Sequence, residues 1–181
     1  MSAPTVIGLD LSLSGTGVAD VDGFTRTIRP KPATLRGGAR LDFLLDALLL
    51  PILSRPTLAV IEDYSPGSVG ISGKLANAEL HGVVTLALHQ HSPSTVIARI
   101  KPTSLKRWAT GNGGAKKDEM VAAALAAGWT GDPKRHDEAD AWHLRALGVQ
   151  FLTGEGPAWQ RELCDAMAWP DVAAPAAGEG E

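Results

Sequence analysis

With 181 residues, the chain is long enough for one globular domain with a continuous core, and its 44% hydrophobic content excludes a largely disordered protein. The single cysteine, Cys164, excludes an internal disulfide and favours a reducing compartment. No stretch approaches the roughly 20 apolar residues that span a bilayer, and the N-terminus lacks a signal-peptide layout, so we expect no membrane partner.

The formal net charge of −3 is unevenly distributed along the chain. From Glu155 onward, six acids accompany one base, whereas the preceding residues hold 16 basic and 14 acidic side chains. The charge balance therefore permits a nucleic-acid partner without demanding one.

The first predicted element is a β-hairpin whose first strand ends on a carboxylate. An apolar run that begins at Val6 stops at Asp10, and a second apolar run follows the small residues up to Gly17. An unpaired buried carboxylate costs several kcal/mol, roughly, unless its pKa shifts. Asp10 instead stabilising its own turn is an equally open interpretation of this stretch.

The later elements alternate between helices and strands. Helical spacing of leucines predicts a helix over 41–53, and the short apolar run 58–61, which Glu62 follows, is typical of a central strand. The other predicted elements are a strand at 24–28, a helix at 73–91, a strand at 96–100, a helical turn at 105–108, and helices at 116–127 and 137–151. This order predicts an α/β domain with a mixed sheet covered on both faces.

Acidic residues stand at the ends of three of these elements. Asp10 and Glu62 each end a strand, while Asp137 and Asp140 share one face at the start of the last helix. If they converge, two like charges about 4 Å apart repel by roughly 4 kcal/mol at an effective dielectric near 20. A hard divalent cation such as Mg²⁺ or Mn²⁺ removes this repulsion. For the aspartate pair alone, helix capping by Asp137 stays open as an alternative.

Several short motifs occur in a defined order and spacing. They are Ile7-Gly8-Leu9-Asp10, Thr16-Gly17, Val60-Ile61-Glu62, Ile100-Lys101-Pro102, Thr110-Gly111-Asn112-Gly113 with Lys116-Lys117, and Asp137-Glu138-Ala139-Asp140-Ala141. In these motifs the chain resembles the RuvC family of Holliday-junction resolvases over residues 6–152, and within it the small phage-type members. It departs from the family pattern at Leu11-Ser12, where Pro-Gly is usual.

The resemblance implies a ribonuclease-H-like α/β fold with a mixed five-stranded sheet and helices on both faces. The nuclease domain would span 1–153, and an acidic tail rich in Ala, Pro, Gly and Glu, partly disordered, would span 154–181. One or two helical turns are expected within 159–167. Asp10, Glu62, Asp137 and Asp140 would be catalytic and would bind two Mg²⁺ ions, which Mn²⁺ can replace. Such ions activate a water and stabilise the leaving oxygen in phosphodiester hydrolysis.

The resemblance further implies that basic residues contact DNA phosphates, namely Lys106, Arg107, Lys116 and Lys117. Lys101 and Asn112, which lie in the motifs above, are further candidates for DNA binding. The expected function is a Mg²⁺-dependent endonuclease that cleaves branched DNA, above all four-way Holliday junctions. We expect a homodimer with its interface on the helix 73–91, in the cytoplasm of a bacterial or phage-infected cell.

Two other functions remain open. One is a module that binds junctions or other branched DNA without cleaving it. The other is a phosphotransferase or ATPase of the actin type, whose first phosphate loop also places an acid and glycines after a strand. Proteins of that type need two ribonuclease-H-like lobes, and this sequence has room for one.

Three aromatic or histidine residues have more than one possible role. Trp108, beside Lys106 and Arg107, suits stacking on single-stranded bases, but core packing is the common role of a helical tryptophan. Tyr64 either distorts the junction, as an aromatic residue does in bacterial family members, or lies half-buried at a strand end. His136 is a weak candidate for holding a water or a metal, and the sequence assigns no role to His81.

Overall fold

The computed structural model describes residues 4–31, 34–64 and 71–171, except the side chains of 71–74 and 76. Its strands form one mixed sheet in the order β3-β2-β1-β4-β5, which confirms the predicted sheet. β1 runs antiparallel to β2 and parallel to β4, which in turn runs parallel to β5. The strands are β1 (Val6–Asp10), β2 (Thr16–Ala19), β3 (Thr25–Ile28), β4 (Leu58–Glu62) and β5 (Val96–Ile100).

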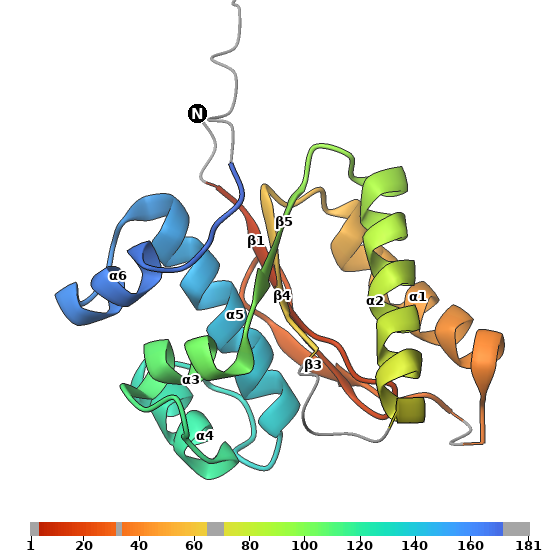
Figure 1. Ribbon diagram of the computed structural model, residues 1–181, viewed down its shortest axis with the longest axis horizontal. Helices are drawn as coiled ribbons and strands as arrows, with labels where there is room; N and C mark the ends of the chain where they lie inside the picture. Colours follow the sequence, from red (N-terminus) through yellow and green to blue (C-terminus); the bar gives the residue numbers. More distant parts are fainter. Residues whose placement is uncertain (1–3, 32–33, 65–70, 172–181) are drawn as a thin grey trace, which may run out of the picture.

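Helices cover both faces of this sheet, as predicted. They are α1 (Gly37–Leu53), α2 (Ile71–His91), α3 (Pro102–Thr110), α4 (Lys117–Ala126), α5 (His136–Thr153) and α6 (Ala158–Asp165). α1 and α2 lie on one face, and α5 crosses the other face with α3, α4 and α6 beside it (Figure 1). No helix in the described part of the chain is long and apolar enough to cross a membrane.

The chain after α5 continues as part of the fold. Cys164 on α6 is buried in the core between α5 and the sheet, and Trp169 stacks on Phe151 with ring centroids 4.0 Å apart. The predicted helical turns at 159–167 therefore form a packed helix. The loop expected at 65–70 and the tail after residue 171 lie outside the described residues.

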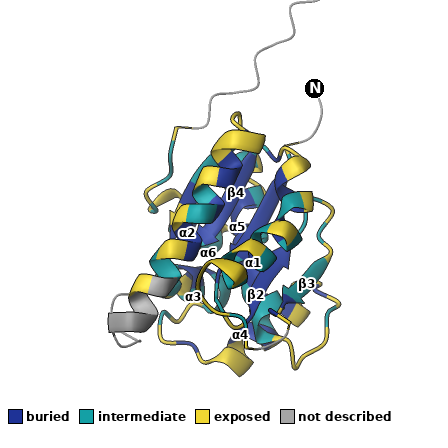
Figure 2. Cartoon of the chain, turned by 90° about the vertical axis from the view of Figure 1, so that its right-hand side faces the viewer, coloured by how far each residue is buried: buried dark blue, intermediate teal, exposed yellow. Residues whose placement is uncertain are grey.

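Alternation along β1 and β4 divides their side chains between the two cores. Ile7 and Ile61 belong to the core beneath α1 and α2, whose outer surfaces are exposed while the strands behind them are buried (Figure 2). Val6 and Val60 belong to the core beneath α5. Because side chains alternate with a period of two, Asp10 and Glu62 share the α5 face with Val6 and Val60.

Glycines on β1 and β2 allow α5 to lie against the sheet at close range. A Cβ added to Gly8 would overlap the carbonyl oxygen of Ala141, and one added to Gly17 would overlap that of Asp137. Both carbonyls belong to α5 within a turn or so of its start. The two glycines therefore fix where the beginning of α5 lies relative to the end of β1.

We predict that Gly17→Ala destabilises the protein by about 3 kcal/mol, at the upper end of the usual cost of overpacking. The added methyl group would push the start of α5 off β2, because the atom that it meets is backbone. Urea unfolding measures the change. The control is Gly38→Ala on α1, where a Cβ meets nothing within 4 Å and where alanine should stabilise the helix slightly. Equal effects of the two substitutions would contradict this account of the packing.

Candidate active site

The structure brings the four predicted carboxylates to one cleft at the carboxyl ends of β1 and β4. β1 and β4 are parallel, with Leu9 opposite Ile61, so the next step along the register places Asp10 beside Glu62. α5 begins near these strand ends and adds Asp137 and Asp140 to the cleft. The cleft has a volume of about 620 Å³ and is lined by all four carboxylates.

The electrostatics of the cleft show that these carboxylates lie within reach of one another. Burial raises the pKa of Asp10 well above its usual value, and the charges of Glu62, Asp140 and Asp137 raise it further. Burial, followed by the charge of Asp140, raises the pKa of Glu62 to about 7. The pKa of Asp140 rises to about 6 through burial and the charge of Asp137, although nearby cations oppose the rise.

Neither local alternative for the acids fits the structure. The turn after β1 is closed by Thr16, whose hydroxyl donates to the Ser12 carbonyl over 2.8 Å and accepts from the Ser12 N–H over 3.2 Å. No described residue hydrogen-bonds the Asp10 carboxylate in this turn. α5 has Arg135, not Asp137, at its N-cap, and no side chain caps the helix by a hydrogen bond. The two acids are therefore free of these structural roles.

Two neighbours in the first turn of α5 differ in what they contact. Glu138 points away from the cleft and accepts hydrogen bonds from Thr25 and Thr27 over 3.4 and 3.1 Å. Asp137 accepts from Arg29, whose Nη2 lies 3.2 Å from its Oδ2. Arg29 follows β3, 108 positions earlier in the chain, and no sequence pattern predicts this contact.

The carboxylates are near one another without being gathered around a point. No three Asp, Glu, His or Cys side chains in the described ranges are grouped tightly enough to hold one metal ion as they stand. Carboxylates whose charge no cation compensates repel one another. The Arg29 contact also draws Asp137 toward β3.

Of the basic residues proposed to contact DNA, two reach the cleft. Lys106 on α3 and Lys117 at the start of α4 line it, and both lower the pKa of Glu62 and of Asp140. Lys101 lies elsewhere, in a hollow that it shares with Met167 after α6. The remaining candidates, exposed on α3, at the start of α4 or in the loop between them, do not line the cleft: Arg107, Asn112 and Lys116.

Sequence reasoning did not identify most of the cleft wall that lies opposite Lys106 and Lys117. That wall contains Asp63 and Tyr64 at the end of β4, and Asn77 and His81 on α2. A helical wheel of α2 places Asn77 and His81 four residues apart on one face, but the sequence does not reveal that this face meets the end of β4.

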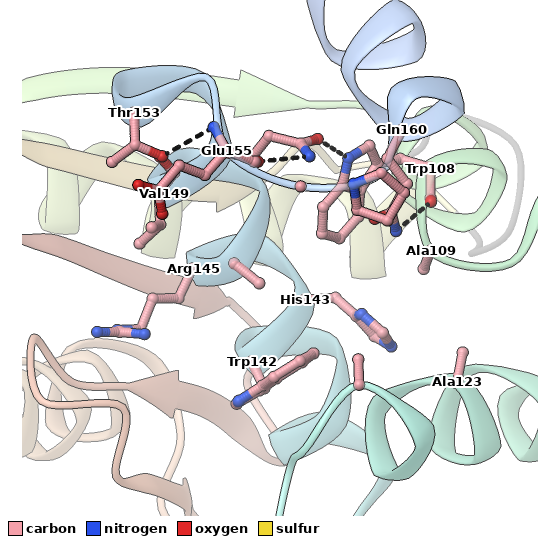
Figure 3. A pocket seen from close by; sticks show the side chains of 15 residues that line it. Trp108, Ala109, Ala123, Trp142, His143, Arg145, Val149, Thr153, Glu155 and Gln160 are labelled. Atoms are coloured by element: carbon pink, nitrogen blue, oxygen red, sulfur yellow. Dashed lines mark hydrogen bonds between the residues drawn. The ribbon is translucent and has the colours of Figure 1, made fainter.

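A second cavity, of about 300 Å³, lies between α5 and its neighbours α3, α4 and α6 (Figure 3). It contains none of the four carboxylates, and its lining includes Trp108, Trp142 and His143. Trp108 is buried and its Nε1 donates to Gln150 Oε1 over 2.7 Å. Trp108 is thus a core residue, which excludes the role in base stacking considered for it.

No protein-family model matches the sequence, and no curated protein sequence matches it. Among solved structures, Thermus thermophilus RuvC is similar with a TM-score of 0.63 and 19% identity, over 83% of this chain and 96% of that chain. T. thermophilus RuvC in complex with a Holliday junction substrate gives 0.63 and 19%, over 78% and 90%. A Fowlpox virus resolvase in complex with Holliday junction DNA gives 0.54 and 11%, over 82% and 99%.

This chain has a RuvC-like fold. The neighbours confirm the ribonuclease-H-like architecture expected from the motifs. In this RuvC-like fold, the motif Thr16-Gly17 has a clear packing role, because Gly17 admits the backbone of α5 and Thr16 closes the turn after Asp10. The motif residues therefore hold the start of α5 against the ends of β1 and β2.

We predict that Glu62→Gln stabilises the metal-free protein at pH 8 and has a much smaller effect at pH 5. A carboxyl whose pKa is about 7 in the fold and 4.5 when unfolded destabilises the fold once it ionises. This cost is full above pH 7 and declines as the pH falls toward 4.5. One pKa unit is worth about 1.4 kcal/mol, so we expect a gain of about 1 to 3 kcal/mol at pH 8.

Urea unfolding in EDTA at both pH values measures this gain. Comparing the variant with the wild type at each pH cancels the titration of groups that both proteins contain. A gain of equal size at pH 5 and pH 8 would show that Glu62 does not titrate in a buried acidic cluster.

Proposed function

We propose that this protein is a divalent-metal-dependent, structure-specific endonuclease that cleaves phosphodiester bonds in branched DNA, above all in four-way Holliday junctions. The observation that carries the proposal is the convergence of four carboxylates from β1, β4 and α5 in one cleft, beside Lys106 and Lys117. Clustered negative charge would weaken a site that only bound phosphates. With cations bound, the same cluster suits phosphoryl chemistry.

The donor set fits Mg²⁺ or Mn²⁺. Its members are all carboxylates, the ligands that hard cations prefer. Burial first, and then the charge of neighbouring carboxylates, raise the pKa values of Asp10, Glu62 and Asp140, and the nearby lysines oppose this rise only in part. We propose Asp10, Glu62, Asp137 and Asp140 as the ligands of two ions. Such ions supply Lewis acidity to a water and to the oxygen that leaves phosphorus.

The chain's own residues position the DNA strand for this reaction. Lys106 and Lys117, which line the cleft, offer ammonium groups to the phosphates of the strand, and Arg29 adds a third cation near Asp137. A water oxygen bonds to phosphorus while the bond from phosphorus to the 3′ oxygen breaks, which leaves a 5′-phosphate and a 3′-hydroxyl. Affinity that rests on phosphate contacts should fall steeply with salt.

The neighbours with bound DNA support a four-way junction as the substrate. A bacterial RuvC and a poxvirus resolvase of similar fold both hold Holliday junctions in their complexes. A four-way junction is therefore the first substrate to test for this chain. We propose that the protein acts in the cytoplasm of a bacterial or phage-infected cell.

Two alternatives are separated from this proposal by simple measurements. A junction-binding module would shift the junction in a gel yet give no product in Mg²⁺ or Mn²⁺. A phosphotransferase or ATPase of the actin type would be stabilised against heat by a nucleotide. The described chain forms a single five-stranded sheet, and nothing in its cleft favours a nucleotide over a DNA strand.

We predict that Asp10→Asn abolishes cleavage of a synthetic four-way junction while leaving its binding intact. Single-turnover cleavage in Mg²⁺ should fall by a factor on the order of 10³ or more, the scale for losing a group central to the chemistry. The dissociation constant measured in EDTA should change by less than about threefold, because phosphate contacts supply the affinity. Lys117→Gln is the matched control with the opposite expectation: it removes a cation from the cleft and should weaken junction binding. Retained cleavage by the Asp10 variant would refute the site.

We also propose that the protein is a homodimer through α2. Leu75 and Leu86 are 62% and 54% exposed, and their spacing of eleven residues puts them on one face of that helix. Between them lies Gly82, where an added Cβ would meet nothing within 4 Å. A small residue between two leucines allows a second helix to approach closely. A dimer would also present two clefts to a junction with two-fold symmetry.

We predict that Leu86→Glu converts the dimer to a monomer, because it places two charges in the apolar contact between α2 helices. Sedimentation velocity at micromolar concentration measures the mass of the particle. Leu125→Glu, an exposed leucine on α4 at the other face of the sheet, is the control and should leave the mass unchanged. A dimer that survives Leu86→Glu would place the interface elsewhere.

A further inference from the structure

His81 is a buried histidine that lines the cleft opposite the lysines. It is 3% exposed and lies on α2, with Tyr64 and Asn77 beside it in the lining. The proposed cleavage mechanism gives it no role. What it offers to a substrate depends on which ring nitrogen carries the proton.

Arg99 on β5 fixes that proton. Its Nη1 lies 2.9 Å from Nδ1 of His81, and because a guanidinium only donates, Nδ1 must accept. Burial and the charge of Arg99 lower the pKa of His81 to about 4, so the ring is neutral at pH 7 with its single proton on Nε2. Arg99 Nη2 also donates to Thr85 over 2.8 Å, and Thr85 donates to the His81 carbonyl over 2.7 Å.

The Nε2–H group of His81 is an unused hydrogen-bond donor on a residue that lines the cleft. It has no hydrogen-bond partner among the described residues, and it is not one of the buried atoms cut off from solvent. Since His81 borders the cleft and its Nδ1 side faces Arg99, a ligand in the cleft is the natural acceptor for this donor.

The surroundings of this donor suit a flat, neutral ligand rather than a phosphate. The Tyr64 ring meets His81 edge-on, with centroids 5.4 Å apart, yet is 43% exposed. Asp63 lies close enough for its charge to raise the pKa of His81, and the same charge would repel a phosphate. Arg99 already uses both amino groups on His81 and Thr85. A nucleobase meets these conditions, since it stacks on a ring and accepts a hydrogen bond at its edge.

We propose that Tyr64, Asn77 and His81 form a subsite for one unpaired nucleobase next to the phosphate at the carboxylates. The base lies against the Tyr64 ring and accepts a hydrogen bond from His81 Nε2–H, while the Asn77 amide supplies a donor and an acceptor. His81 is therefore a residue that determines sequence preference, and Arg99 positions it. This inference rests on the proposed cleavage of branched DNA and specifies which side chains read its sequence.

Two substitutions of His81 separate the donor from the contact with Arg99. His81→Asn keeps a polar atom near the place of Nδ1 and loses the donor at Nε2, whereas His81→Gln does the reverse. Cleavage rates are measured on a panel of four-way junctions that differ only in the bases at the crossover. We expect His81→Asn to reduce the ratio between the fastest and the slowest junction by about five- to tenfold, the worth of one hydrogen bond. His81→Gln and the exposed control His89→Asn should retain most of it.

The outcomes distinguish this inference from the proposed function. A wild-type protein that neither binds nor cleaves junctions refutes both. A wild type that cleaves without sequence preference, or a His81→Asn variant with the wild-type ranking and melting temperature, refutes the subsite alone. If both variants fail to fold, single abasic positions in the DNA test the wild-type protein. One abasic site beside the cleaved phosphate should weaken binding in EDTA by about fivefold or more, and a flat abasic scan would overturn the proposal.

Discussion

The close approach of α5 to β1 and β2 determines the rest of this structure. Because Gly8 and Gly17 have no side chains, the backbone of α5 lies directly on the sheet. Its first turns then extend past the end of β1, which puts Asp137 and Asp140 within electrostatic range of Asp10. Any larger residue at either glycine would separate the acids contributed by the helix from those contributed by the sheet.

This packing buries acidic side chains close together, which is unfavourable for folding. The raised pKa values of Asp10, Glu62 and Asp140 mean that the ionised cluster opposes folding at neutral pH. Lys106 and Lys117 offset part of that cost from one wall. Such tension between stability and local charge is common at functional sites.

Sequence patterns predicted the parts of the site that depend on local periodicity. Strand patterns placed Asp10 and Glu62 each at the end of a strand, and helical spacing placed Asp137 and Asp140 on one face. The structure adds that the two strands are parallel neighbours, which brings Asp10 and Glu62 together. The contacts that join distant elements had no such signal. Examples are the contact of Arg29 with Asp137 and that of Arg99 with His81. The position of Lys101 outside the cleft is another. All three depend on how the helices and strands pack against one another. Trp108 lies next to two basic residues, but its burial depends on the packing of α5 and α6.

If the four carboxylates act as proposed, oxygen atoms from β1, β4 and α5 bind cations at one place. Anomalous X-ray scattering from crystals soaked in Mn²⁺ locates such ions without reference to activity. We expect anomalous peaks between Asp10, Glu62, Asp137 and Asp140, lost in crystals of the Asp10→Asn variant. Peaks elsewhere on the protein, with none at these four carboxylates, would contradict the proposal.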